Sequence, residues 1–414
     1  MTGTVVLLGL VSMLTDVSSE SVNAVLPIYL ATVVGLGPLG YGFVDGLYQG
    51  VSTLVRVAGG WMADAYDRPK WVAFAGYAVS AASRVALLAA QGVAVVAAVV
   101  TADRLGKGLR TAPRDALISA STPAIHLGNA FGVHRAMDTA GALIGPVVAF
   151  VVLIAVPQGY HAVFVVSFAF AVAGLAVLGF LVPDVRRAAP SKSTSAGVPA
   201  QAPCQLDQAD PSHTAPTARP AWRLLAATPS LRRLLLGAGV LAVLTIGDGF
   251  LYLALQDRDQ FAARFFPLLY VGTNAAYLAL AVPLGRLADR MGRARVLVLG
   301  HLSLLAAYVC ALGVLTGPVA TLSCLALLGA FYAATDGVLA ALASCLVPAP
   351  MRATGIAAAQ TVVAGGRLVA SVLFGLAWTL TGRDQAVLGV ALVLAAAIPL
   401  VLRLLRGVEP GNAS

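Results

Sequence analysis

The eleven residues GRLADRMGRAR, at positions 285–295, follow a long apolar run and end in a basic cluster. A similar stretch, GWMADAYDRPK, stands at positions 60–70, 225 residues earlier, and also follows an apolar run. Both stretches have a glycine, an aspartate four residues later and then basic residues. A loop that recurs in this way indicates a duplicated set of membrane spans whose halves pack around a central pathway.

Long apolar runs surround both stretches. A membrane-spanning helix needs about 20 mostly apolar residues, and Gly, Pro or charged breaks divide the chain into twelve runs of that length. We expect spans at residues 4–34, 39–62, 71–90, 93–121, 127–155, 161–182, 231–255, 265–286, 296–315, 318–346, 353–380 and 385–405. The sequence therefore predicts an all-α membrane protein with twelve transmembrane helices in two pseudo-symmetric six-helix bundles.

The composition excludes several classes of protein. Hydrophobic residues make up 59% of the 414 residues and charged residues 11%, and the mean hydropathy is +0.87. A soluble chain has about 25% charged residues, so a soluble enzyme, a nucleic-acid-binding protein and a disordered chain are all poorly supported. The chain has no Gly-rich phosphate loop and no spacing of a nucleophile and a base, so neither an enzyme nor a cofactor is predicted. The four cysteines suggest no disulfide framework.

The middle and the ends of the chain differ from the spans. Residues 188–222 contain six prolines and almost no large aliphatic residues, which is typical of a flexible linker. We therefore expect a bundle at 1–183, a cytoplasmic linker at 184–230, largely disordered, a second bundle at 231–405 and a tail at 406–414. The N-terminal apolar run has no preceding Lys or Arg and contains Asp16 and Glu20, so we do not expect a cleaved signal peptide.

The basic residues outside the spans predict the orientation. With both termini in the cytoplasm, about 16 Lys and Arg lie on the cytoplasmic side and three, Arg258, Arg264 and Arg383, on the other. Such a bias favours this topology by the positive-inside rule. We expect a multi-pass protein of a bacterial cytoplasmic membrane that functions as a monomer.

Over nearly its whole length the chain resembles the major facilitator superfamily, whose loop between the second and third helices reads G-x-L-A-D-R-x-G-R-[RK]. The second half matches it at Gly285, Leu287, Ala288, Asp289, Arg290, Gly292 and Arg293; the first half keeps Gly60, Ala63, Asp64 and Arg68 but has Asp67 and Pro69 where the family has Gly and a basic residue. Arg104 and Gly108 match the family's R-x-x-x-G element. The resemblance implies that these loops gate the cytoplasmic side, the alternative being that their charges only set the topology.

Gly141, Gly145 and Pro146 match G-x-x-x-G-P, the family element associated with antiporters. Close helix packing is a sufficient alternative reason for these residues. The stretches RLGKGLRTAPRDALIS and FGVHRAMDTAGALIGP look like a bacterial group described as drug-efflux-like. The resemblance therefore implies a twelve-helix drug:proton antiporter-like transporter, in which these three residues take part in gating.

Acidic residues on the first span are the candidates for proton coupling. Asp16, Glu20, Asn23 and Pro27 recur at intervals of four, three and four, so they share one face of a helix. A charge at mid-membrane is costly and should face the bundle interior or water. We expect Asp16 and Glu20 to load and release a proton, with Arg104 and Asp138 tuning them; the alternative is that both acids only pair with arginines.

The other buried polar residues predict a substrate site. Eight acids and eight bases lie within the spans, thirteen of the sixteen in the first half, so full internal pairing is also possible. An i, i+4 pair of Asp103 and Lys107 is expected to be structural. His134 is expected to bond Asp138 rather than a metal. We assign substrate contact to Asn23, Asp45, Gln49, Arg56, Arg84, Lys107, Arg135, Asn274, Gln360 and Arg367.

These features predict a secondary transporter that exchanges protons for a small organic solute or drug and exports it by alternating access. Because several arginines are buried and only 7% of residues are aromatic, a polar or anionic solute is as well supported as a hydrophobic drug. An importer or facilitator of a polar or anionic metabolite is the alternative. A membrane receptor or assembly factor that moves no solute is a third hypothesis.

Overall fold

The computed structural model describes residues 3–66, 68–123, 126–184, 228–313, 317–348 and 351–408, in which every regular element is a helix. The first half contains α1 (Gly3–Asn23), α2 (Leu26–Thr32), α3 (Pro38–Tyr66), α4 (Pro69–Ala89), α5 (Gly92–Ala120), α6 (Leu127–Ala155), α7 (Tyr160–Ala176) and the π-helical turn η2 (Val177–Leu181). The second half contains α9 (Pro229–Val243), α10 (Asp248–Asp259), the 3-10 turn η3 (Ala263–Phe265), α11 (Pro267–Met291), α12 (Arg293–Ala311), α13 (Pro318–Cys345), α14 (Arg352–Thr381) and α15 (Arg383–Leu404).

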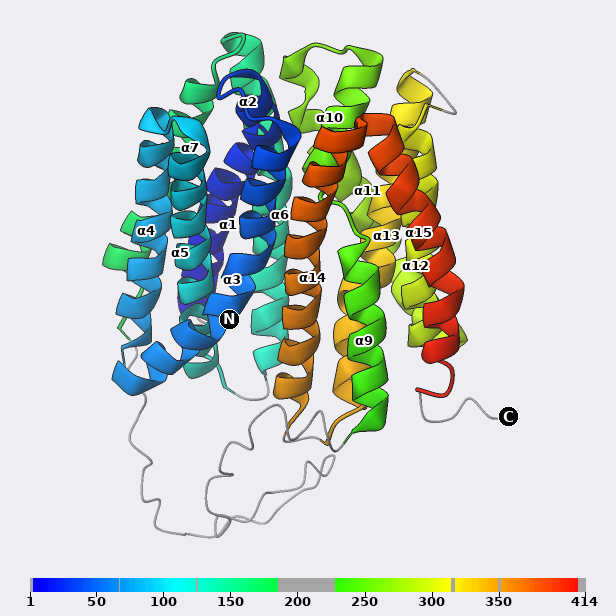
Figure 1. The fold of residues 1–414 in the computed structure, drawn as a ribbon. Coiled ribbons are helices and arrows are strands. Elements are labelled where there is room, and N and C mark those ends of the chain that lie inside the picture. The colour runs from blue at the N-terminus through cyan, green and yellow to red at the C-terminus, as the bar shows by residue number, and fades with distance from the viewer. Residues whose placement is uncertain are drawn as a thin grey trace.

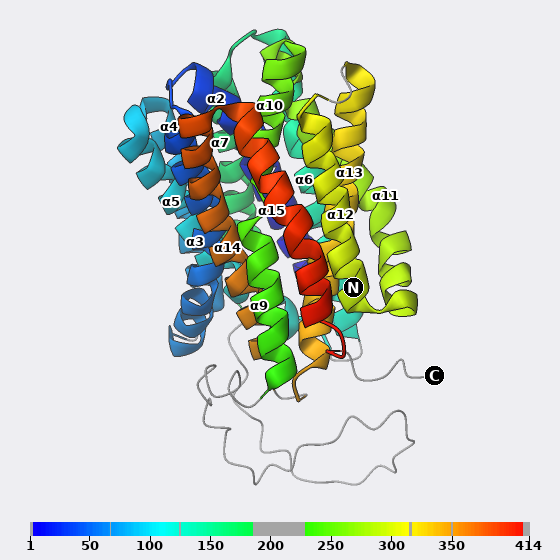
Figure 2. The ribbon, with the colours of Figure 1, turned by 45° about the vertical axis from the view of Figure 1, so that its right-hand side comes forward.

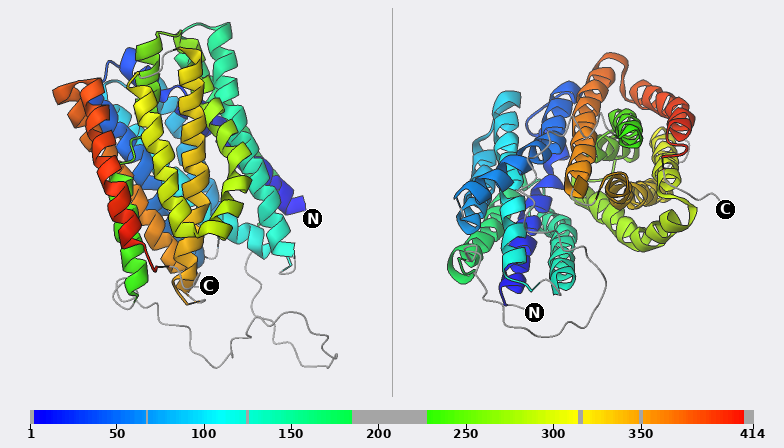
Figure 3. Two further views of the ribbon diagram at one scale, coloured as in Figure 1. Left: turned by 90° about the vertical axis from the view of Figure 1, so that its right-hand side faces the viewer. Right: turned by 90° about the horizontal axis from the view of Figure 1, so that it is seen from below.

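The helices form two bundles that stand side by side, one of α1–α7 in blue to green and one of α9–α15 in green to red (Figures 1 and 2). The view from below keeps this division (Figure 3). Among the described residues, ten helical spans are long and apolar enough to cross a membrane. The helices α3 and α5, of 29 residues each, lie among them and complete the twelve. The predicted fold class is confirmed.

Two predicted spans are not continuous helices. The first is interrupted at Ala24 and Val25, just before Pro27, which has no N–H to continue the helical hydrogen bonds. The span expected at 231–255 is interrupted between α9 and α10. There the Tyr308 hydroxyl accepts a hydrogen bond from the Ile246 N–H at 2.8 Å and donates one to a backbone carbonyl of the same break at 3.0 Å. Non-helical backbone at membrane depth needs partners of this kind.

The two bundles meet along α3 and α14. Three glycines four residues apart, Gly42, Gly46 and Gly50, lie on the face of α3 that contacts α14, and a Cβ at Gly46 would stand 2.9 Å from the Leu368 carbonyl oxygen. Only residues without a side chain allow two helix backbones this close.

Further contacts between the bundles lie at their upper end in Figure 1, where α2 and α10 adjoin. A Cβ at Gly249 would stand 2.9 Å from Pro27 Cγ, and the Phe150 and Phe265 rings are 6.0 Å apart. We call this end, formed by α2, α10 and η3, the closed end.

Some predictions lie outside the described residues. The expected linker at 184–230 is described only at its margins, and the tail only to residue 408. For Gly60 and Asp64 the structure describes the backbone of α3 and no side-chain position.

Candidate functional site

The acidic stripe of the first span lies against α6. Asp16 and Glu20 are one turn apart on α1, and Gly141 and Gly145 of α6 face them. A Cβ at Gly141 would stand 3.1 Å from that of Asp16, and one at Gly145 would stand 2.8 Å from that of Glu20. Pro146 follows directly inside α6. The two glycines therefore allow the α6 backbone to approach the turn of α1 that carries both acids.

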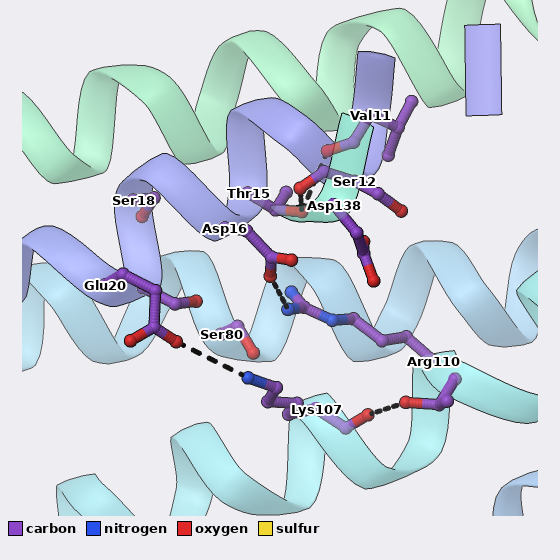
Figure 4. Close-up of polar contacts among 12 residues, drawn as sticks. Val11, Ser12, Thr15, Asp16, Ser18, Glu20, Ser80, Lys107, Arg110 and Asp138 are labelled. Atoms are coloured by element: carbon purple, nitrogen blue, oxygen red, sulfur yellow. Dashed lines mark hydrogen bonds and ion pairs between the residues drawn. The ribbon is translucent and has the colours of Figure 1, made fainter. Parts of the chain in front are cut away.

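Both acids form ion pairs with α5 (Figure 4). Asp16 lies 3.7 Å from the Arg110 guanidinium, and Glu20 lies 3.8 Å from the Lys107 ammonium. Their side chains are 17% and 20% exposed, so water reaches both carboxylates. These separations exceed a direct hydrogen bond. The two acids are therefore loosely paired and partly exposed.

A tighter cluster of charges lies deeper in the first bundle. Asp103 accepts hydrogen bonds from Arg84 at 2.8 Å and from Arg104 at 2.5 Å, and the three side chains are almost fully buried. The predicted i, i+4 pair of Asp103 and Lys107 is wrong, because Asp103 faces these arginines and Lys107 reaches Glu20 instead. Arg84 and Arg104 thus share one carboxylate inside their own bundle.

Asp138 of α6 joins the same polar region. It lies 3.5 Å from Arg114 and 3.7 Å from Arg135, whose side chain is 81% exposed. His134 does not bond Asp138 as expected; its Nε2 lies 2.9 Å from the Ser12 hydroxyl. In the part of the chain that is described, no group of three or more His, Cys, Asp or Glu side chains is arranged to hold a metal ion.

A small cavity lies between the two bundles, next to the closed end. Its polar lining comes from both halves: Asn23 at the end of α1, Tyr41, Asp45, Tyr48 and Gln49 on α3, Asp248 on α10 and Tyr270 on α11. Ligand sites bring together a few convergent polar groups in this way. The structure thus brings together three of the predicted substrate residues, Asn23, Asp45 and Gln49.

Asn23 connects this cavity with the acidic stripe. Its side-chain amide donates a hydrogen bond to Glu20 Oε2 at 3.0 Å, and the same residue lines the cavity. Asn23 also lines a smaller cavity of about 270 Å³ inside the first bundle, beside Arg84 and Asp103. One side chain at the interruption of the first span therefore contacts both the candidate proton site and the candidate solute site.

The two carboxylates of the cavity differ from those of the stripe in their partners. Asp45 accepts a hydrogen bond from the Ser371 hydroxyl of α14 at 2.5 Å, and Asp248 accepts one from the Tyr332 hydroxyl of α13 at 2.7 Å. Among the described residues neither has an ion-pair partner within 4.0 Å.

The sequence interpretation assigned no role to Asp248, Tyr270 or Ser371. For Asp248 a signal existed, since an acid flanked by Gly247 and Gly249 interrupts an apolar run. Nothing in the local pattern marks Tyr270 or Ser371.

The remaining predicted substrate residues lie apart from this cavity. Arg56 donates a hydrogen bond to Gln360 across the two bundles at 3.3 Å. The Arg367 guanidinium lies over the Tyr332 ring, 5.5 Å from its centroid, and its Nε is buried with no hydrogen-bond partner among the described residues. Asn274 is half-buried on α11 and lines neither cavity.

Of the residues assigned to gating, Gly141, Gly145 and Pro146 lie inside α6, whereas Asp289, Arg290, Gly292 and Arg293 lie where α11 ends and α12 begins. Asp289 forms an ion pair with Arg293 at 3.0 Å, and Arg293 also donates to Cys345 Sγ at the end of α13. Gly292, between α11 and α12, has a φ of +98°, a conformation that favours glycine. Arg290 lies in the last turn of α11 and Arg68 directly before α4, whereas Gly285 lies inside α11, where its Cβ would meet nothing within 4 Å.

Comparisons with known proteins agree with this architecture. A family model described as Major Facilitator Superfamily matches residues 8–266. An uncharacterized MFS-type transporter of Methanocaldococcus jannaschii is 30% identical over 91% of this chain and 89% of its own length. An uncharacterized protein of Mycobacterium bovis is 28% identical over 73% of this chain and 69% of its own length.

Solved structures show the same fold at low sequence identity. A mutant of the nucleoside transporter NupG has a TM-score of 0.78 at 14% identity, with 97% of this chain and all of that chain covered. A bacterial homolog of the human lysosomal transporter Spinster, inward-facing and unoccupied, has a TM-score of 0.72 at 13% identity, with 99% and 98% covered.

Proposed function

The chain belongs to the Major Facilitator Superfamily, and from this premise we propose that it is a proton-coupled secondary transporter that exports a small organic solute by alternating access. The observation that carries the proposal is the position of Asn23. It lines the cavity between the bundles and donates a hydrogen bond to Glu20, which is itself paired with Lys107. Protonation of Glu20 weakens its hold on Lys107 and Asn23, and so alters the wall of the solute cavity.

The contacts between the bundles support alternating access. They lie at the closed end, between α6 and α11, and along α3 and α14, where Gly42 and Gly46 approach backbone carbonyls of α14. The proposed transport cycle opens this end and closes the other as the halves 1–183 and 231–405 rock about the cavity. The contact of Asp289, Arg293 and Cys345 joins α11, α12 and α13 within the second bundle at the opposite end.

The proposed orientation places that opposite end in the cytoplasm. The turns before α4 and α12 carry basic clusters, and both termini and the 184–230 linker lie on this side of the predicted topology. The closed end then faces outward. We place the protein as a functional monomer in a bacterial cytoplasmic membrane, in the group that resembles drug:proton antiporters.

The test is solute-dependent proton movement through the purified protein. Liposomes that contain the protein and a trapped pH dye receive single solutes from a panel of amines, nucleosides, peptides and organic acids. Wild-type protein should move protons when one class of solute is added, and Asp16→Asn/Glu20→Gln should not. Ser323→Ala is the matched control, since Ser323 is half-buried and, among the described residues, its hydroxyl bonds only Val319 of its own helix.

The outcome also decides the direction and the coupling. In everted vesicles, accumulation that collapses with a protonophore supports export by exchange with protons. Accumulation that is indifferent to the protonophore, or an unchanged rate in the double variant, would contradict coupling through the acidic stripe.

A further inference from the structure

The cavity between the bundles, defined above by its lining, contains two carboxyl groups that have no basic partner in that lining. Asp45 and Asp248 face it from opposite bundles, and no lysine or arginine is among the described residues that line it. Both carboxylates accept hydrogen bonds from neutral hydroxyl groups, those of Ser371 and Tyr332. A hydroxyl donor satisfies one oxygen and leaves the charge in place.

The acids of the first bundle provide the contrast. Each of Asp16, Glu20, Asp103, Asp115 and Asp138 has a cationic partner within 4.0 Å. These five acids each have a basic partner within 4.0 Å, whereas the two acids at the cavity have none among the described residues. Because unpaired buried charge is costly, a ligand that supplies the opposite charge gains binding energy there.

The basic residues do not favour an anion. Lys107, Arg110 and Arg114 each pair with an acid of their own bundle, and Arg84 and Arg104 share Asp103. The Arg367 guanidinium lies over the Tyr332 ring, and the Tyr332 hydroxyl donates a hydrogen bond to Asp248. No basic residue in the described lining of the cavity is thus available to hold an anionic solute.

Aromatic rings complete the lining in a way that suits a cation. Tyr41, Tyr48 and Tyr270 belong to the cavity wall. Tyr48 already binds a cation through its ring face, since the Arg104 guanidinium stacks on that ring at 3.7 Å. Carboxylates give charge-assisted hydrogen bonds to ammonium groups, and tyrosine faces attract cations.

We infer that the cavity between the bundles selects an organic cation, such as a solute with a protonated amine or a quaternary centre, held between Asp45 and Asp248. This inference deepens the proposed function and names its substrate class. It assigns Asp248, which enters from the interrupted span of the second bundle, a role equal to that of Asp45.

The test is equilibrium binding of two ions of matched shape and opposite charge, tetraphenylphosphonium and tetraphenylborate, to the purified full chain in detergent. Wild-type protein should bind the phosphonium and discriminate against the borate at least tenfold. Asp45→Asn and Asp248→Asn should each weaken phosphonium binding at least tenfold. Asp384→Asn, an exposed acid at the start of α15, should leave it unchanged, and melting curves should show all variants folded.

Equal binding of the two ions, binding of neither, or undiminished phosphonium binding in both aspartate variants would overturn the inference. The readout needs no proton movement. If the phosphonium binds as expected but no solute drives protons in liposomes, the cation site stands and the coupling proposal fails. If anionic solutes alone move protons and the phosphonium does not bind, the coupling proposal stands and the cation site fails.

Should an aspartate variant fold poorly, the smaller change Ser371→Ala provides a second route. It removes the neutral donor to Asp45 and keeps the carboxylate. Under the inference, phosphonium binding is then retained or strengthened; a tenfold loss would count against charge recognition by Asp45.

Discussion

Ser371 of α14 donates a hydrogen bond to Asp45 of α3, with 2.5 Å between Oγ and Oδ2. The bond joins the two bundles beside the cavity. The backbone carbonyl of Ser371 also packs against Gly42 of α3, where a Cβ would clash with it. One serine thus contributes both to the contact that holds the bundles together and to the environment of an acid in the cavity. A change of access must break this bond.

We therefore expect Ser371→Ala to favour opening of the closed end. A hydrogen bond to a charged group contributes about 1.5–3 kcal/mol, which corresponds to a shift of roughly tenfold or more in the population. Hydrogen–deuterium exchange should become faster in α2 and α10. Ser323→Ala removes a hydroxyl that bonds within α13, and exchange there and at the closed end should stay as in the wild type. Equal hydrogen–deuterium exchange in both variants would mean that the Ser371 hydroxyl does not help to keep the closed end shut.

Gly145→Ala should destabilise the first bundle. Its Cβ would stand 2.8 Å from that of Glu20 and 2.9 Å from the Ser21 nitrogen, and overpacking of this kind costs about 1–3 kcal/mol. The melting temperature of the purified protein should fall. Gly389→Ala on α15 is the matched control, because its Cβ meets nothing within 4 Å and alanine is the better helix former. A melting temperature for Gly145→Ala at or above that of Gly389→Ala would contradict the packing role.

Asp103→Asn should be the most damaging single charge change in the described part of the chain. It leaves the guanidinium groups of Arg84 and Arg104 buried without a counter-charge, and breaking a buried pair in this way costs about 3–5 kcal/mol. Asp384→Asn removes an acid that is 64% exposed, where an ion pair contributes about 0–1 kcal/mol. Size-exclusion profiles and thermal melting should separate the two variants; similar stability would mean that Asp103 does not hold the cluster.

Local periodicity was sufficient to place the acids on their helices. Asp16, Glu20 and Asn23 share a face because residues three and four apart do so in any α-helix, and the same reasoning placed Asp45 and Gln49 on the side of α3 that lines the cavity. The two bundles were predictable for the same reason, because the repeated loop and the apolar runs can each be read from a short stretch of sequence.

The ion-pair partners were not predictable in this way. Lys107 lies one turn from Asp103 in sequence, yet it reaches Glu20 on another helix, because the glycines of α6 and the crossing of α1 with α5 decide which charges meet. The interruption of the seventh span depends on the Tyr308 hydroxyl, which comes from α12, more than 60 residues further along the chain. Partners set by tertiary packing leave no mark in a local pattern.

Of the two acids on the stripe, we expect Glu20 rather than Asp16 to couple the proton to the solute. Glu20 accepts a hydrogen bond from Asn23, which lines the cavity, whereas Asp16 lines neither cavity and is paired with Arg110. Glu20→Gln should therefore abolish accumulation driven by a pH gradient in liposomes while solute exchange between equal concentrations continues, because exchange needs no net proton movement. Asp16→Asn should keep both activities above half of the wild-type rate. The reverse pattern, with gradient-driven accumulation lost in Asp16→Asn and kept in Glu20→Gln, would mean that Asp16 carries the proton. The hydrogen bond between Asn23 and Glu20 would then have no role in coupling.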